Sequence, residues 1–478
     1  MKANGELMPL SANHNLPLEE LDKRYFFHPA TSISDHLTNG PRIMERGSGV
    51  RVTDSKGKSY IDGAAGLWCV NIGYGRTEVA EAIAEQAKKL AFFHAFTSMS
   101  NEPAIRLAEK VVTLAPKGMS RVFFGNSGSD ANDTNIKLVW YYNNQRGLKN
   151  KKKIISRKRA YHGITLGGGS CTGLPINHEK FDLPLDRFRH TESVDQYREK
   201  PAGMTEEQFA THLAQQLENM ILTEGPETVA AFIAEPLMGT GGVLPPPKGY
   251  FPKVQEVLDR YDVLMIADEV ICGFGRLGSM FGSDHYGIRP DFMTLAKGLS
   301  SGYQPISGSI VSERVWKVLE DTAPSMPGFG HGFTYSAHPI CAAAALANLE
   351  IVTSENLAEN AATVGAHLKS RLTELLIDHS MIGDIRGEGL MMGIELVADK
   401  DTKRPLDPSL KAAGRVMKQG YEEGIICRAL PHRDVIAMSP PLVLTKSEAD
   451  EYAAGLAKSI RTVADQLMRS GEWSPKLN

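Results

Sequence analysis

Two stretches in the middle of the chain are apolar at nearly every position and then end in acidic residues. They are VAAFIAE at 229–235 and VLMIADEV at 263–270. Strands buried on both faces show such continuous runs, because helices cover both sides of a parallel sheet. Shorter runs at 121–124, 153–156 and 291–297 alternate with helix-like stretches such as residues 129–144. The pattern predicts an α/β fold with a mainly parallel central sheet.

The flanking segments show a different pattern. Residues 40–62 alternate apolar positions with glycine turns, which favours strands. Beyond residue 337, helical stretches are interspersed with strand candidates at 424–430 and 435–445. We therefore predict a large α/β domain at residues 73–337. A smaller α+β domain is expected from both chain ends, residues 1–72 and 338–478.

The composition is that of a soluble globular protein, with 42% hydrophobic and 23% charged residues. The net charge of -3 gives no reason to expect nucleic acid or an anionic membrane as a partner. The basic run at 149–159, KNKKKIISRKR, is interpreted as a solvated loop edge. The N-terminus lacks the apolar core of a secretory signal. The apolar run near 340–347 is far shorter than the ~20 residues of a membrane helix.

The cysteines are scattered, odd in number and without a CxxC pair, which supports neither a disulfide framework nor a zinc site. We expect no metal site and a reducing, cytoplasmic location. The five cysteines are Cys69, Cys171, Cys272, Cys341 and Cys427.

The segment GNSGSDAND at 125–133 lies between a predicted strand and a predicted helix. Backbone N–H groups at a helix N-terminus bind anions, and Ser127, Gly128 and Ser129 suit a phosphate. An ordinary capped turn is the alternative. Further along, RAYHG at 159–163 follows another strand, where Tyr161 and His162 can place a flat face over a planar ligand or simply pack.

Acidic residues end the two buried strands. A buried carboxylate needs a partner, so Asp268 requires a cation or a strong donor. A protonated pyridine nitrogen would serve, and a salt bridge to Arg276 is the alternative. Glu235 ends the other strand.

Lys297 follows Asp268 by 29 residues, at the end of the next predicted strand. A lysine in a partly desolvated site has a lowered pKa and becomes an amine nucleophile, although a solvated loop lysine is also possible. Thr334, in GHGFTYSAHP at 330–339, offers a further hydroxyl for a phosphate. Together these elements match the phosphate, flat ring, ring nitrogen and aldehyde of pyridoxal 5′-phosphate.

At this point the chain resembles the class III aminotransferases among the fold-type I enzymes that depend on pyridoxal phosphate. It is most similar to the ω-transaminases that use pyruvate as amino acceptor. The likeness runs from about residue 26 to 467. Its motifs are AAGLWCVNIGYG, FFGNSGSDAND, YHG, AAFIAEPLMGTGGV, VLMIADEVICGFGRLG, DFMTLAKGLSSGYQP and HGFTYSAHP.

The resemblance implies a role for each matching residue. Lys297 binds the cofactor aldehyde covalently and moves the proton, and Asp268 pairs with the ring nitrogen. The other cofactor contacts that it implies are Ser127, Gly128, Ser129, Tyr161, His162, Val270 and, from the partner subunit, Thr334, with Glu235 as a supporting acid. The substrate pocket that it implies is formed by Trp68, Phe96, Tyr161, Phe333 and Arg428, the last binding the carboxylate of the acceptor.

The sequence departs from the family pattern at two places. Asp130 stands where the family usually has Glu, and the loop after Arg428 adds Arg433 as a second candidate for the carboxylate. The resemblance implies a homodimer with two sites, possibly a dimer of dimers. It also implies a ping-pong transamination from a primary amine, diamine or ω-amino acid to pyruvate.

Alternatives remain open at this stage. A more specific polyamine, β-alanine or γ-aminobutyrate aminotransferase is one, and a glutamate-1-semialdehyde aminomutase another. A regulator that binds the cofactor without turnover would need a DNA-binding domain. Only about 25 residues precede the resemblance.

Overall fold

The computed structural model describes residues 16–325 and 328–474. Its centre is a seven-stranded sheet in the order β4-β10-β9-β8-β7-β5-β6. Only β10 is antiparallel to its neighbours, so the other six strands run in one direction. The mainly parallel sheet predicted from the apolar runs is confirmed. Its strands are β4 Met119–Gly125, β5 Lys153–Arg157, β6 Phe188–Thr191, β7 Val229–Ala234, β8 Leu264–Asp268, β9 Phe292–Leu295 and β10 Ser307–Ser312.

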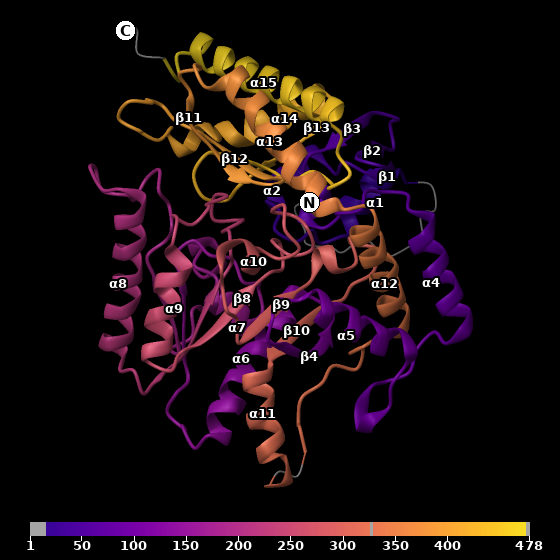
Figure 1. Cartoon of the computed structure of the whole chain (residues 1–478). Coiled ribbons are helices and arrows are strands. Elements are labelled where there is room, and N and C mark those ends of the chain that lie inside the picture. The colour runs from indigo at the N-terminus through magenta and orange to yellow at the C-terminus, as the bar shows by residue number, and fades with distance from the viewer. Residues whose placement is uncertain (1–15, 326–327, 475–478) are drawn as a thin grey trace, which may run out of the picture.

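The central strands are buried on both faces. In β8, Met265 and Ala267 join one apolar cluster, whereas Leu264 and Ile266 join a second on the opposite face. The first cluster also takes residues from α5 Glu102–Leu114, α8 Glu206–Glu224, α9 Tyr250–Arg260 and α12 Pro339–Ser354. The second takes residues from α6 Gly128–Gln145, α7 Leu166–Cys171 and α11 Glu313–Thr322. Helices thus cover both faces, as the continuous apolar runs predicted (Figure 1).

Two smaller four-stranded sheets lie above this domain in Figure 1. One sheet contains β1 Met44–Ser48, β2 Arg51–Asp54, β3 Ser59–Asp62 and β13 Ile425–Ile426. The other contains β11 Ile382–Glu388, β12 Met391–Leu396, β14 Arg428–Ala429 and β15 Val435–Met438. Because β13 pairs with β3, strands from both chain ends share one sheet. The domain boundaries at 72/73 and 337/338 stay predictions.

The remaining helices complete these layers. Over the smaller sheets lie α13 Leu357–Leu376, α14 Ala412–Glu422 and α15 Lys446–Arg469. Elsewhere the chain forms α3 Ala65–Trp68, α4 Thr77–Lys89, α10 Gly282–Tyr286 and the short helices η1 Phe96–Ser98, η2 Pro175–Asn177, η3 Lys297–Leu299, η4 Ala323–Ser325 and η5 Pro408–Leu410. None of the helices in the described ranges combines the length and apolar character needed to cross a bilayer.

Two expectations about strands are corrected. The stretch 435–445 forms a strand only over its first four residues, because Pro440 and Pro441 follow and proline cannot donate to a ladder. The stretch 424–430 splits into β13 and β14, which belong to different sheets. Cys427 lies between them and is buried.

The interpretation of the basic run at 149–159 as a solvated loop edge is wrong. Lys151, Arg157 and Arg159 are buried. The Lys151 ammonium donates to two backbone carbonyl oxygens, and Arg159 forms a buried ion pair with Asp195. Partners distant in sequence offset the desolvation of these cations, which local composition does not reveal.

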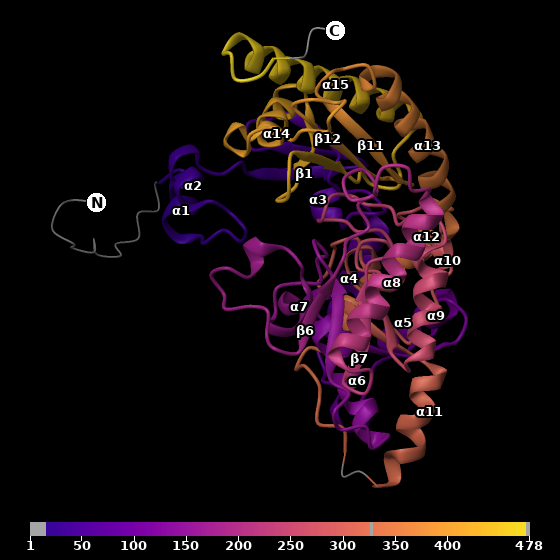
Figure 2. The ribbon, with the colours of Figure 1, turned by 90° about the vertical axis from the view of Figure 1, so that its left-hand side faces the viewer.

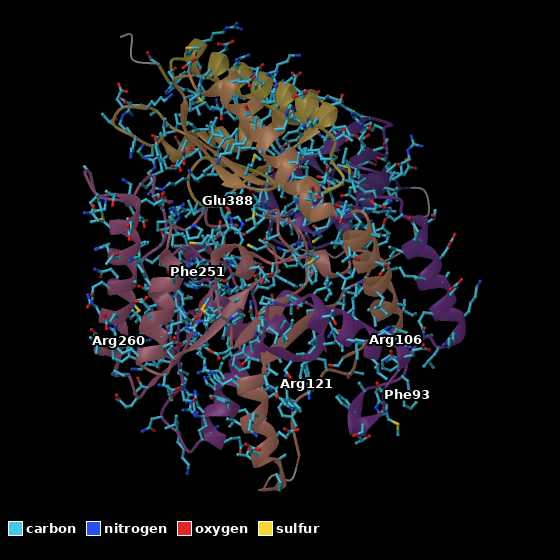
Figure 3. All side chains as sticks on the ribbon, viewed as in Figure 1. Phe93, Arg106, Arg121, Phe251, Arg260 and Glu388 are labelled. Carbon is cyan, nitrogen blue, oxygen red and sulfur yellow. The ribbon has the colours of Figure 1, made fainter. Side chains whose placement is uncertain are left out.

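The two parts of the molecule also meet through side chains. Glu388, at the end of β11, lies where the upper layers reach the large domain (Figure 3). His285 of α10 places its Nε2 atom 2.5 Å from Glu388 Oε2. A buried cation reinforces the junction, because Arg276 donates to the Leu390 and Pro440 carbonyl oxygens.

Near the N-terminus, α1 Leu18–Tyr25 and α2 Ile33–Asn39 form a helical hairpin. Figure 2 shows this hairpin projecting to one side of the molecule. Neither helix contains a buried residue.

Candidate active site

Several of the predicted functional residues gather at one edge of the large sheet. Asp268 is the last residue of β8, Glu235 follows β7, and Lys297 follows β9. Ser127 comes two residues after β4, and Tyr161 comes shortly after β5. These strands are parallel to one another, so their carboxyl ends meet at the same edge, where open α/β sheets bind ligands.

Asp268 is 3% exposed and receives three hydrogen bonds. The backbone N–H of Val270 donates to Oδ1 over 3.1 Å. The Asn132 amide donates to Oδ2 over 2.8 Å, and His162 Nδ1 lies 2.8 Å from the same oxygen. The salt bridge to Arg276, considered as an alternative, is not formed. Arg276 instead donates to Asn71 and to the carbonyl oxygens at the domain junction.

Asn132 was not identified from the sequence, although it connects several parts of the site. Its amide also donates to the backbone oxygen of His162 over 2.8 Å, and its own oxygen accepts from the Thr294 hydroxyl over 2.6 Å. Asn135, one turn further along α6, donates to the same hydroxyl over 2.8 Å. The available signal was two asparagines one turn apart among the apolar positions of a helix, a pattern that Asn143 of the same helix also shows without contacting the site.

Lys297 adopts a left-handed backbone conformation, with φ of 45°. Burial lowers the pKa of its ammonium group, because desolvation disfavours the charged form. The positive charge of Arg428 lowers the pKa further, while Cys69, Asp268 and Glu235 act in the opposite direction. The solvated loop lysine is therefore not what the structure shows. An amine whose pKa is lowered in this way is a stronger candidate for a nucleophile and a base.

The turn before α6 is organised by Asp130. Ser127 caps the helix by accepting from the Asp130 backbone N–H, and the Asp130 carboxylate accepts from the Ser127 N–H over 3.0 Å. Ser307 donates to the same carboxylate over 2.8 Å. Aspartate thus completes the capping box at the position where the family usually has glutamate. The first N–H groups of α6, at Gly128 and Ser129, have no acceptor within a helix and suit an anion.

Val270 links this turn to Asp268. A Cβ atom placed on Gly128 would lie 3.0 Å from Val270 Cγ2. Glycine at position 128 therefore lets the phosphate turn approach the strand end closely.

Glu235 holds the segment that carries Tyr161. One carboxylate oxygen accepts from the Tyr161 N–H over 3.1 Å, and the other accepts from the Gly239 N–H over 2.7 Å. Burial raises the pKa of Glu235, which is 3% exposed. Burial also raises the pKa of Tyr161.

Arg428 and Arg433 are the two candidates for binding a substrate carboxylate, and their surroundings differ. Arg428 influences the pKa values of Tyr161 and Lys297, and its guanidinium carbon lies 6.0 Å from the centre of the Trp68 ring. Burial lowers the pKa of Arg428. Arg433 is exposed, and its charged neighbours include Arg198 and Arg159 instead.

The predicted aromatic pocket residues fall into two groups. Trp68 is buried beside Arg428. Phe96 instead packs against Gly332, and Phe333 lies with its ring centre 6.1 Å from that of Phe123. Thr334, next to Phe333, is exposed on the single chain. The roles of these last residues across a subunit interface stay predictions.

The family model for aminotransferase class-III matches residues 33–460. The chain belongs to this family. The aminotransferase is 50% identical over 458 residues to a diaminobutyrate–2-oxoglutarate transaminase of Halomonas elongata, covering 95% of this chain and 98% of that protein. It is 45% identical to a mitochondrial γ-aminobutyrate transaminase of Solanum lycopersicum, covering 88% of this chain and 81% of that protein.

Among solved structures, the aminotransferase is similar to an ω-transaminase from Pseudomonas jessenii in complex with PMP. The two share 46% identity with a TM-score of 0.92, over 95% of this chain and 99% of the other. This likeness confirms the predicted fold type I. Family and relatives together identify the protein as an aminotransferase dependent on pyridoxal phosphate.

The residues at the sheet edge fit that cofactor. A helix N-terminus with a close-approach glycine suits the phosphate, and a buried carboxylate suits the ring nitrogen. His162, whose Nδ1 atom contacts Asp268, has a buried Nε2 atom without a hydrogen-bond partner among the described residues. A lysine with a lowered pKa completes the set.

Proposed function

We propose that this aminotransferase moves an amino group from a primary amine, a diamine or an ω-amino acid to pyruvate in a ping-pong reaction. The observation that carries the proposal is the position of Arg428. Its guanidinium group lies by the Trp68 ring and close enough to Lys297 to lower the pKa of the lysine. A cation at this place can bind the carboxylate of a keto acid beside the amine that reacts.

We assign the following roles to the chain's own groups. Ser127, Gly128 and Ser129 would bind the phosphate, with Thr334 of a second subunit, and Tyr161 and Val270 would pack against the ring. Asp268 would accept a hydrogen bond from the protonated ring nitrogen, and the hydrogen bonds that it receives from Asn132 and Val270 fix the direction of its carboxylate. When bound, the cofactor supplies an electron sink for the carbon that loses its proton.

Lys297 then acts as the base. Because burial lowers its pKa, a larger fraction of the amine is uncharged near neutral pH and able to accept a proton. The same amine returns the proton in the next step. Trp68, with Phe96 and Phe333 of the dimer, provides an apolar space for the body of the amine.

A second candidate is a more specific enzyme. The relatives include a diaminobutyrate–2-oxoglutarate transaminase and γ-aminobutyrate transaminases, whose names point to ω-amino substrates and, in the first case, to 2-oxoglutarate as acceptor. We propose a cytoplasmic homodimer in either case, without a nucleic-acid or membrane partner.

Absorbance of the purified enzyme tests both proposals. With added pyridoxal phosphate we expect a visible band that an amine donor bleaches and that pyruvate restores faster than 2-oxoglutarate. Lys297→Ala should lack the band, whereas Lys317→Ala, at an exposed lysine, should keep it. Faster recovery with 2-oxoglutarate would favour the more specific enzyme. A band that no amine bleaches would overturn transamination by this site.

A further inference from the structure

The hairpin of α1 and α2 has no apolar core of its own. Neither helix buries a residue, and Leu18, Phe27 and Ile33 are each more than half exposed. Short segments that cannot bury apolar surface usually depend on a metal, a disulfide or association for order. No cysteine lies among residues 16–68, so a disulfide within the hairpin is excluded.

Three side chains from different parts of the hairpin converge on one point. His28 Nε2 lies 2.9 Å from Asp22 Oδ1 and 3.0 Å from Oδ2. His36 Nε2 lies 3.2 Å from the same Oδ1. One potential ligand atom from each residue lies within 4.8 Å of the others. Asp22 comes from α1, His28 from the connecting loop and His36 from α2.

The direction of the His36 ring matters here. Its Nε2 atom is buried and, within the described ranges, has no hydrogen bond of acceptable geometry, although Asp22 is so close. The ring centres of His28 and His36 are 4.5 Å apart, with 46° between the planes. A hydrogen-bonded pair would account for His28 and Asp22 but leaves His36 Nε2 without a role.

These separations match a metal site. Ligands bound to zinc at about 2.0–2.1 Å in a tetrahedral arrangement lie about 3.3–3.4 Å apart. The observed separations of 2.9 and 3.2 Å are within a few tenths of an ångström of that value. Two imidazoles and one carboxylate are also a set of ligands that zinc-class cations bind.

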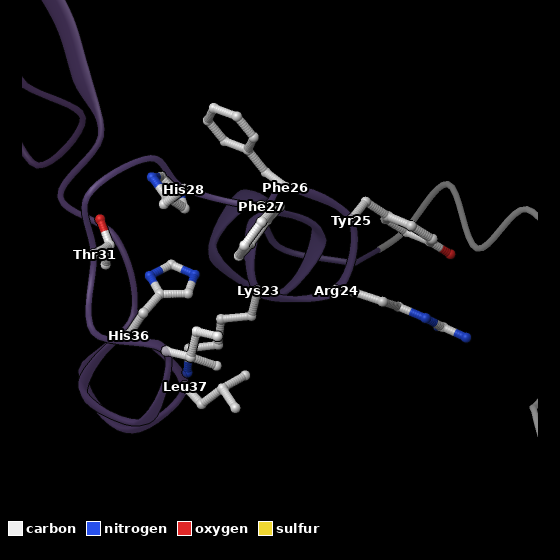
Figure 4. A pocket seen from close by; sticks show the side chains of 10 residues that line it. Lys23, Arg24, Tyr25, Phe26, Phe27, His28, Thr31, His36 and Leu37 are labelled. Carbon is white, nitrogen blue, oxygen red and sulfur yellow. The ribbon is translucent and has the colours of Figure 1, made fainter. Parts of the chain in front are cut away.

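We propose that Asp22, His28 and His36 bind a divalent cation of the zinc class and so connect α1 to α2. His28 and His36 line a cavity of about 230 Å³ (Figure 4), which leaves room for water at the fourth position. Lys23 lines the same cavity, and its positive charge repels a cation. The Glu20 carboxylate, 3.7 Å from the Lys23 ammonium, offsets part of that charge. The proposal does not depend on the substrate or the acceptor.

Zinc uptake by the untagged full-length enzyme tests the site. After treatment with a chelator, the protein is dialysed against ZnCl₂ and its bound metal is measured. We expect the dialysed protein to hold one zinc per chain more than the chelator-treated protein. His36→Gln and Asp22→Asn should not take up this zinc. The matched control is His367→Gln, because His367 also pairs with an aspartate, Asp450, over 2.8 Å but without a second histidine. This control should take up as much zinc as the unchanged protein.

Cobalt binding to the unchanged protein gives a second readout that needs no variant. Co²⁺ held by nitrogen and oxygen ligands should give visible bands without the charge-transfer band of a thiolate, which separates this site from half-buried Cys69. The cofactor absorbance of each variant shows whether it has folded. Equal zinc uptake by His36→Gln and the unchanged protein, or a thiolate spectrum with Co²⁺, would overturn the proposal.

Discussion

His162 Nδ1 lies 2.8 Å from Asp268 Oδ2, and both side chains are buried. Asn132 donates to the same oxygen, so two neighbours from separate elements fix the orientation of one carboxylate. Functional side chains must be held in their productive orientation by neighbouring hydrogen bonds, and loss of such a neighbour commonly lowers activity.

We therefore expect Asn132→Ala to lower kcat by about 10- to 100-fold, because Asp268 loses one of the donors that orient it. The control is Asn143→Ala. This change removes a buried amide from the same helix, but that amide donates to the backbone oxygen of Lys151 and does not contact the site. Steady-state kinetics with a single amine would check both variants. Equal losses of kcat would show that helix stability, rather than the orientation of Asp268, is responsible.

Gly128→Ala should weaken cofactor binding. The added Cβ would lie 3.0 and 3.1 Å from the two Val270 methyl groups, and both the turn and the strand end would have to move apart. We expect the dissociation constant for pyridoxal phosphate to rise by about 5- to 160-fold, since overpacking commonly costs about 1–3 kcal/mol. Gly414→Ala is the control, because its Cβ would meet only Lys411 Cβ at 3.9 Å within α14. Fluorescence titration with the cofactor would measure both.

Arg428→Ala should raise KM for pyruvate by about tenfold or more, in line with the loss of a charged hydrogen bond. The half-reaction with an amine that lacks a carboxylate should change little. Arg433→Ala should leave both steps unchanged, because the charges around it are those of Arg159, Arg198, Asp195 and Glu395. Stopped-flow measurement of the two half-reactions separates these effects. A larger effect at Arg433 would reverse the assignment.

Because Glu269 is buried, we expect the free energy of unfolding to depend on pH. Burial raises the pKa of its carboxyl group from 4.5 to about 7, although it accepts hydrogen bonds from the Gly282 and Ser283 N–H groups. The folded protein therefore binds this proton more tightly than the unfolded chain. The contribution of Glu269 to stability must fall as pH rises from about 4.5 to about 7.

Glu269→Gln removes the titrating group and should remove this dependence. Its amide nitrogen cannot accept a hydrogen bond, so one of the Gly282 and Ser283 N–H groups loses its acceptor and we expect the variant to be less stable than the unchanged protein at pH 5. Between pH 5 and pH 8 the unchanged protein should lose up to about 3 kcal/mol of stability that the variant keeps. Calorimetry at the two pH values checks the prediction, and an equal change of stability in both proteins would refute it.

Much of the site could be predicted from the sequence because it follows from where strands end. Asp268, Glu235 and Lys297 each follow a continuous apolar run, and a parallel sheet brings such ends together. Asn132 could not be found in this way, since its partners lie 30 and 136 residues away. The burial of Arg159 likewise depends on Asp195, and the meeting of Asp22 with His36 depends on a turn without a recognisable motif.

The pairing of β3 with β13 delays completion of one small sheet until late in synthesis of the chain. Ile61 is matched with Ile425, so the partner of β3 leaves the ribosome 364 residues later. Until then, β3 is the open edge of its sheet, and unpaired edges invite association with other chains. The large domain can fold during this interval, because all seven strands of its sheet come from residues between β3 and β13. Nascent chains halted before residue 425 should therefore contain a folded large domain attached to an unfinished sheet.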